Sequence, residues 1–161
     1  MIDRQKLTTA VQDAIAGTDM FLVDIKITPA NDITVELDSP TGMDIDTCAA
    51  VTRKIEAVFD REAEDYSLEV GSAGLTAPFK VRGQYLKNLG NEVEVLCGGK
   101  KVRGTLTEVA PEDPAAPDEI VFTVEVPTKV KEPGAKRPVT VMTPTVFKAS
   151  ECKSVTYLIK F

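Results

Sequence analysis

Hydrophobic residues in the first half of the chain follow two periods in turn, a helical one and an alternating one. Over residues 7–15 they recur every third or fourth position, which predicts a helix with one buried stripe. Residues 21–27 and 33–37 alternate apolar with polar side chains, which predicts two strands joined by a turn at 29–32. A second helical stripe follows over 44–59, and alternation returns over 66–70. The predicted order is therefore α-β-β-α-β.

Polar residues and a glycine at the ends of these patterns indicate where the helices begin and end. Asp3 and Asp44 stand where a helix N-cap is needed, and Gly17 is suited to end the first helix. A right-handed crossover through the second helix is expected to place the third strand beside the first. Both helices would then cover one face of a three-stranded sheet.

The second half of the chain has the pattern of an all-β domain. Short apolar or alternating segments near 93–95, 102–109, 120–126, 139–141 and 155–161 predict five strands, and no helix of useful length is expected. Proline-rich stretches at 111–118 and 127–138 predict two long loops. Five short strands in so short a segment favour a small barrel, because closure removes exposed edges. The chain is thus predicted to be α+β, with domains at residues 1–82 and 83–161.

Missing residue types exclude several kinds of chemistry. The 161 residues include no His and no Trp, which rules out a Ser-His-Asp triad and any His metal ligand. Cys48, Cys97 and Cys152 form no C-x-x-C pair, and such a sparse, odd set is typical of reduced thiols in a cytosolic protein. The charged N-terminus lacks the apolar core of a signal peptide, and no apolar run could span a membrane. We therefore expect a cytoplasmic, non-enzymatic protein without metal or cofactor.

Charge is distributed unevenly along this acidic chain, whose net charge is −6. Residues 1–82 carry eight basic and 15 acidic side chains, whereas residues 127–161 carry seven basic and two acidic ones. An overall acidic chain is poorly suited to unspecific nucleic-acid binding, so any contact with RNA needs a local basic patch. The predicted loop 127–138 holds the richest such patch, with Lys129, Lys131, Lys136 and Arg137 as candidate partner- or rRNA-binding residues. A merely solvated loop is the alternative interpretation.

Other candidate sites have ordinary structural explanations. The segment 71–74 has the letters of the G-x-x-G clamp of KH domains but follows a strand and lacks a neighbouring basic residue, which favours a turn leaving the sheet. Gly98 and Gly99 indicate a hairpin turn rather than a phosphate loop. Asp44 and Asp46 are explained by helix capping, and Cys48 by a place in the core.

Two stretches of the chain resemble motifs of the ribosome maturation factor RimP family. Residues 44–55 are similar to the family's helix with the core Asp-Cys-Ala-x-Val-(Ser/Thr)-Arg. Residues 66–78 are similar to its Tyr-x-Leu-Glu-Val-Ser-Ser-Pro-Gly-Leu-Asp-Arg-Pro-Leu motif. This sequence has Gly71 and Ala73 in place of a Ser and a Pro, and Thr76 and Ala77 in place of the Asp-Arg pair. The missing Arg is the motif residue best able to grip a phosphate.

The resemblance implies an α/β N-terminal domain followed by an SH3-like (Sm-like) barrel. It also implies a bacterial, non-enzymatic assembly factor that acts on free, immature small (30S) ribosomal subunits. Its partner would be a basic decoding-side ribosomal protein, the twelfth of the small subunit, whose incorporation it assists. The net charge of +5 over residues 127–161 suits small-subunit rRNA as a further partner. The turn near the domain junction is then a candidate functional element, formed by Ser72, Gly74, Leu75 and Pro78. We expect Gly74 to hold a positive φ there.

Two other classes of function remain open on the sequence alone. A generic RNA-binding adaptor would use the barrel as its RNA module and would bind RNA tightly without a ribosomal protein. A hydrolase or transferase would use Asp or Glu with a metal ion and would show metal-dependent turnover. Co-sedimentation with free small subunits, and not with mature ribosomes, distinguishes the assembly factor from both.

Overall fold

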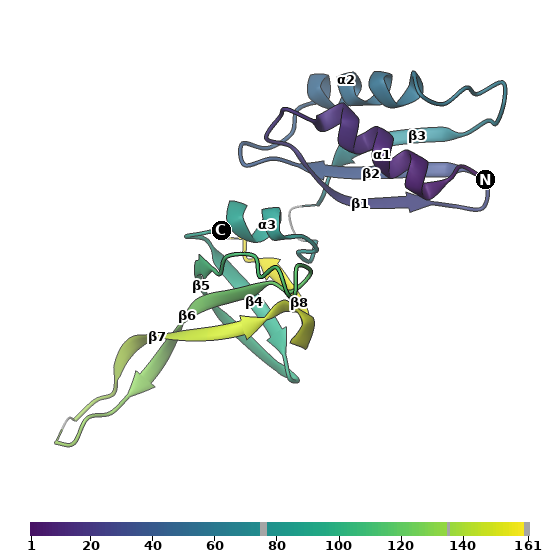
Figure 1. Cartoon of the computed structure of the whole chain (residues 1–161). Helices are drawn as coiled ribbons and strands as arrows, with labels where there is room; N and C mark the ends of the chain where they lie inside the picture. The colour runs from purple at the N-terminus through teal and green to yellow at the C-terminus, as the bar shows by residue number, and fades with distance from the viewer. Residues whose placement is uncertain (75–76, 135, 160–161) are drawn as a thin grey trace. The chain divides into compact units, whose positions relative to one another are not determined.

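The chain forms two compact units, Met1–Gly74 and Leu75–Phe161, which we describe separately. The computed structural model describes residues 1–74, 77–134 and 136–159 (Figure 1). Within this described part of the chain, no helix is both long enough and apolar enough to cross a membrane.

The first unit has the predicted element order. Its elements are α1 (Arg4–Ile15), β1 (Phe21–Ile27), β2 (Asp32–Asp38), α2 (Ile45–Glu56) and β3 (Ser67–Ser72). Both predicted caps are confirmed: the Asp3 carboxylate accepts a hydrogen bond from the Gln5 N–H (2.8 Å), and Asp44 accepts one from the Thr47 N–H (2.7 Å). Gly17 follows α1 with a φ of 78°, a conformation that favours glycine over residues with a Cβ. Local propensity therefore explains the helix ends.

The order of strands in this unit differs from the sequence-based expectation. The sheet order is β1-β2-β3, so the third strand lies beside the second and not beside the first. β3 runs parallel to β2 from the pair Asp32–Ser67 to the pair Leu37–Ser72. Because β1 and β2 form an antiparallel hairpin, the crossover through α2 can dock its strand on either side of it. The hydrophobic pattern of β3 is the same in both arrangements, so the pattern alone does not distinguish them.

The core of the first unit lies between the sheet and the two helices. Leu7 and Val11 of α1, Val35 and Leu37 of β2, and Ile55 of α2 are all fully buried in one cluster. Both helices cover the same face of the sheet, as predicted (Figure 1). The opposite face bears the polar residues of the alternating pattern.

The second unit is built on a five-stranded antiparallel sheet. Its elements are α3 (Arg82–Lys87), β4 (Glu92–Cys97), β5 (Lys100–Val109), β6 (Val121–Val130), β7 (Val139–Lys148), the 3₁₀ turn η1 (Ala149–Glu151) and β8 (Cys152–Tyr157). The sheet order is β7-β6-β5-β4-β8, and the sheet curls around one core. Phe122 lies in this core, 5.0 Å from the ring centroid of Tyr85 and 5.6 Å from that of Phe147. The α+β fold class is confirmed.

A short helix in the second unit was not expected from the sequence. α3 is six residues long and buries Gln84 and Tyr85 against the sheet. The Gln84 side-chain oxygen accepts hydrogen bonds from the N–H groups of Lys80 and Val81, which closes the helix start. One and a half turns are too short for a helical period to be visible in a sequence, so this element depends on tertiary burial.

The predicted loop 127–138 is shorter in the structure and the strand after it is longer. β6 continues to Val130, and β7 runs from Val139 to Lys148, so Lys129 lies in a strand paired with Thr140. Pro127 made the end of β6 look like the start of a loop in the sequence. Beyond Glu125, β6 pairs only with β7 among the described strands, and a strand with one open side tolerates a residue that lacks an N–H group.

Candidate functional site

The two stretches that resemble the family motifs meet in the first unit. The start of α2 and the end of β3 line a shallow cavity of about 290 Å³, with Asp44, Ile45 and Cys48 on one side and Val70 and Ser72 on the other. Residues almost 30 positions apart are thus joined in one surface because the crossover brings α2 back over β3. The resemblance in sequence corresponds to one place in the fold.

The α2 end of this cavity combines a charge with an exposed hydrophobic side chain. Hydrogen bonds from the side chain and N–H of Thr47 lower the pKa of Asp44, which keeps its carboxylate ionised at the positive end of the helix. Ile45 is 87% exposed although it opens a helix with an apolar stripe. Cys48 is partly exposed beside it, so its expected place in the core was wrong. The residues that α2 buries are Val51 and Ile55.

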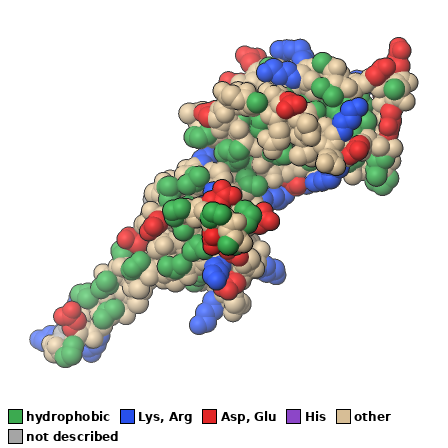
Figure 2. Space-filling model, viewed as in Figure 1, with side chains coloured by type: hydrophobic (Ala, Val, Ile, Leu, Met, Phe, Trp, Pro, Cys, Tyr) green, Lys and Arg blue, Asp and Glu red, His purple; other side chains and the backbone are tan. Residues whose placement is uncertain are grey.

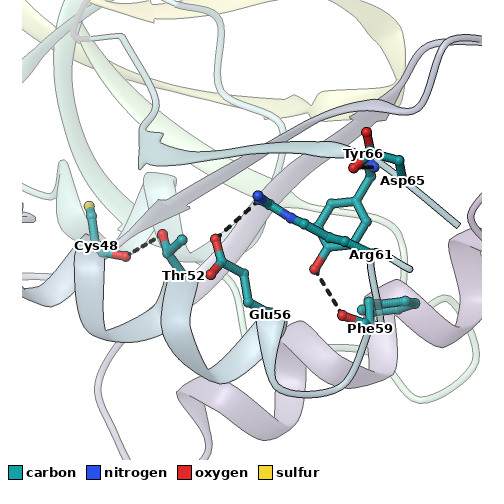
Figure 3. Close-up of polar contacts among 7 residues, drawn as sticks. All are labelled: Cys48, Thr52, Glu56, Phe59, Arg61, Asp65 and Tyr66. Carbon is teal, nitrogen blue, oxygen red and sulfur yellow. Dashed lines mark hydrogen bonds and ion pairs between the residues drawn. The ribbon is translucent and has the colours of Figure 1, made fainter. Parts of the chain in front are cut away.

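The opposite end of α2 is fastened by the polar contacts drawn in Figure 3. The hydroxyl of Tyr66 donates a hydrogen bond to the carbonyl oxygen of Phe59 (3.1 Å), and Arg61 pairs with Glu56 (3.4 Å). The Arg61 guanidinium also lies 4.9 Å from the centroid of the Tyr66 ring. These contacts hold the turn that leads from α2 into β3.

The predicted turn residues are only partly accounted for by the structure. Ser72 is exposed at the end of β3 and lines the cavity, Gly74 is exposed beyond it, and Pro78 is exposed in the second unit. Leu75 lies outside the described residues. Gly71 belongs to β3 and not to a turn. The expected positive φ of Gly74 stays a prediction.

The predicted basic residues lie on a β-hairpin that extends from the second sheet, and we call residues 126–143 the hairpin arm (Figure 1). Lys129 is on β6, Lys131 follows the end of β6, and Lys136 and Arg137 precede β7. All four side chains are exposed, and none forms an ion pair within the described ranges 1–74, 77–134 and 136–159. The arm therefore presents cations that no acidic group of the described chain neutralises.

The hairpin arm also carries a hydrophobic stripe that the sequence patterns did not reveal. Every second residue of a strand shares a face, so the side of β6 that buries Phe122 and Val124 continues through Thr128 to Val130. The opposite strand contributes Val139 and Val141 to the same side, where they are 51% and 45% exposed. Figure 2 shows hydrophobic side chains along the arm and basic ones at its end. Alternating valines predicted a strand, but not that this strand leaves the core.

A surface of opposite charge lies on the first unit. The sheet face away from the helices carries five carboxylates and one lysine, namely Asp24, Asp32, Glu36, Asp38, Glu69 and Lys26. Lys26 pairs with Glu36 at 3.3 Å. Counted by unit, residues 1–74 hold six basic and 15 acidic side chains, and residues 75–161 hold 13 and 10. The net charges of −9 and +3 are more sharply separated than a cut at Arg82 indicated.

Comparisons with known proteins agree with the motif resemblance. Residues 10–76 match the family model of the RimP N-terminal domain. The chain is 45% identical over 138 residues to the ribosome maturation factor RimP of Porphyromonas gingivalis, which covers 85% of this chain and 86% of that protein. It is 32% identical over 114 residues to the factor of the same name from Flavobacterium psychrophilum, covering 70% and 74% of the two chains. This chain therefore belongs to the ribosome maturation factor RimP family, which is not a family of enzymes.

Proposed function

We propose that this protein is a cytoplasmic maturation factor of the small ribosomal subunit, which binds free, immature small subunits and assists the incorporation of a basic ribosomal protein. The observation that carries the proposal is the 45% identity to a protein named ribosome maturation factor over 85% of the chain. The separation of charge between the two units supports a division of labour between two kinds of partner.

The hairpin arm is the proposed contact with rRNA. Its four exposed cations lie within one hairpin, and Glu132 is the one acidic residue of that segment. Lysine and arginine side chains bind nucleic acid mainly by neutralising phosphates, which releases counterions. An arm that projects beyond the folded core can reach phosphates that a compact domain cannot approach closely.

The acidic sheet face of the first unit is the proposed contact with the ribosomal protein. Ribosomal proteins are strongly basic, and opposite charges on two partners speed their encounter more than they strengthen the final complex. Asp32 and Glu69 are exposed on this face. Replacing both with Asn and Gln should slow association with the basic protein, whereas Asp13→Asn with Glu62→Gln is a control with the same charge change elsewhere in the unit.

The experiment that tests the proposed function is sedimentation of the tagged chain with bacterial ribosomes on a sucrose gradient. We expect the chain to migrate with free small subunits and to be absent from mature ribosomes. Migration with mature ribosomes or with large subunits would contradict the proposal. Equally tight binding to naked rRNA and to subunits would instead favour a general RNA-binding adaptor.

A salt series tests the role of the hairpin arm. Replacing Lys129, Lys131, Lys136 and Arg137 with Ser should weaken small-subunit binding most at low salt. The log–log salt dependence should flatten by about one unit or less for each phosphate that the arm no longer neutralises. The control replaces four exposed lysines of the same unit by Ser, namely Lys100, Lys101, Lys148 and Lys153. If both variants bind equally weakly, net charge and not the arm is responsible.

A further inference from the structure

Two cysteines that are far apart in the sequence lie opposite each other in the second sheet. Cys97 is the last residue of β4 and Cys152 is the first residue of β8, and the antiparallel ladder pairs them where its register shifts by one residue between Leu96 and Cys97. The sequence alone indicated no partner for either thiol, because 54 residues separate them and the pairing arises only when β8 returns to the edge of the sheet.

The position of this pair suits a covalent cross-link. Opposed residues of a regular antiparallel ladder have Cα atoms about 4.5–5.5 Å apart, which lies within the range of about 4.4–6.8 Å found for disulfides. The two cysteines are paired in this ladder beside a register shift of one residue. Cys97 and Cys152 both pack against the core of this unit, so their side chains lie on the same face of the sheet. Both side chains pack at the margin of the core and are partly exposed, so an oxidant from solvent can reach them.

In the structure both cysteines are free thiols, and each thiol donates a hydrogen bond. The Cys97 thiol donates to the carbonyl oxygen of Glu151 (3.4 Å), and the Cys152 thiol donates to that of Lys148 (3.3 Å). Burial, together with the neighbouring Cys97 side chain, raises the pKa of Cys152 to about 12. Cys152 therefore stays protonated at neutral pH, a state in which a thiol is a weak nucleophile.

We propose that Cys97 and Cys152 form a dithiol site that peroxides oxidise to a disulfide between β4 and β8. Cys97 loses its thiol proton and its sulfur attacks one peroxide oxygen, the O–O bond breaks, and a sulfenic acid forms while the other oxygen takes up that proton and leaves as water. The Cys152 sulfur then attacks the sulfenic sulfur, and the hydroxyl group leaves with the Cys152 proton as a second water. Two thiols lose two electrons and two protons, and one molecule of hydrogen peroxide becomes two of water.

The location of the site indicates what the cross-link would stiffen. Cys152 lines a cavity of about 180 Å³ together with Phe79, Tyr85 and Val155. The Phe79 N–H donates to the Val155 carbonyl oxygen (2.8 Å), so the segment that enters the second unit is held by the same edge strand. A disulfide would close a loop from 97 to 152 that contains β5, β6, β7 and the hairpin arm, and would fix β8 to its neighbour.

The test uses the full chain, first reduced and then treated with hydrogen peroxide. We expect intact mass spectrometry to show a loss of two hydrogens, peptide mapping to show residues 97 and 152 linked, and dithiothreitol to reverse the change. The melting temperature should rise by roughly 5 °C or more on oxidation, because the closed loop is long. The disulfide is expected whether or not the proposed function is correct.

Three single variants make the test decisive. Cys48→Ser should behave like the wild type, whereas Cys97→Ser and Cys152→Ser should lose the internal disulfide and accumulate overoxidised or intermolecular products. If the wild type gives only those products, or if linked peptides contain Cys48, the proposal is wrong. A wild-type chain that keeps three free thiols after peroxide treatment would equally overturn it.

Discussion

Two strand glycines show how much a single position can depend on its surroundings. A Cβ at Gly104 in β5 would press against the carbonyl oxygen of Glu125 and lie 2.7 Å from a methyl carbon of Val124. A Cβ at Gly71 in β3 would meet nothing within 4 Å. Both glycines lie in strands, and neither has the positive φ that would explain a glycine by backbone conformation. The close approach of β6 is therefore what requires glycine at position 104.

These glycines give a matched pair of substitutions. Gly104→Ala should destabilise the protein by about 1–3 kcal/mol, because backbone atoms of β6 must move to admit the methyl group. Gly71→Ala should be neutral or stabilising by about 0.5 kcal/mol, since alanine loses less conformational entropy on folding. Urea unfolding of both variants measures this difference. Equal stabilities would show that β5 and β6 are less closely packed than we describe.

The Asp44 cap makes the stability of α2 depend on pH. Its pKa is lowered in the folded state, so its contribution is fully present above the unfolded pKa near 3.8 and is lost as pH falls through the folded value. Asp44→Asn keeps an oxygen that accepts a hydrogen bond but removes the titrating charge. The melting temperatures of variant and wild type should therefore differ most at neutral pH and converge in acid. A constant difference across this range would contradict a charge effect.

At the scale of elements, the hairpin arm consists of paired strands whose outer part lies outside the core. The last β6 residues that the core encloses or contacts are Val124 and Val126, whereas Val130 and its partner Val139 are exposed. Beyond this point the hairpin is held by its own ladder and by cross-strand contacts on either face. A partner can therefore bind the outer part of the arm without disturbing the packing of the core.

Shortening the arm tests whether the fold depends on its outer part. Replacing residues 129–140 by an Asn-Gly turn keeps the pair Thr128–Val141 and suits a two-residue hairpin. We expect the melting temperature to stay within a few degrees of the wild type, while binding to small subunits falls at least as far as in the fourfold basic variant. A large loss of stability would show that the arm supports the fold.

At the scale of the whole molecule, the two units have separate cores and opposite net charges. The core of the first unit uses α1, α2 and its sheet, and that of the second is centred on Phe122, Tyr85 and Val155. Phe79 packs edge-on against Tyr85 at 5.1 Å and is hydrogen-bonded to β8. The segment 77–84 is therefore part of what the second unit needs in order to fold.

Fragments of the chain test this organisation. We predict that residues 1–74 and 77–161, expressed separately, each give dispersed amide NMR spectra like those of the full chain. A fragment of residues 85–161 should be clearly less stable, because it lacks Phe79 and the Gln84 side chain that closes α3. Collapsed spectra for both longer fragments would contradict two independent units, and equal stability of 77–161 and 85–161 would contradict the role of the segment.

The sequence by itself determined the elements of this protein whose signals are local. Alternation marked the hairpin of β1 and β2, capping aspartates marked both long helices, and the two motif stretches pointed to the family. These signals need no knowledge of distant residues, because side-chain period and backbone capping act within a few positions.

Only the tertiary structure decided which elements and residues meet. β3 lies beside β2, α3 exists because the sheet buries Tyr85, and the strand that carries Val139 and Val141 begins outside the core. The meeting of Cys97 with Cys152 is likewise a result of sheet order. Each of these features depends on contacts between residues far apart in the chain. A periodic pattern predicts that one face of an element is buried, but it does not identify the element that covers this face.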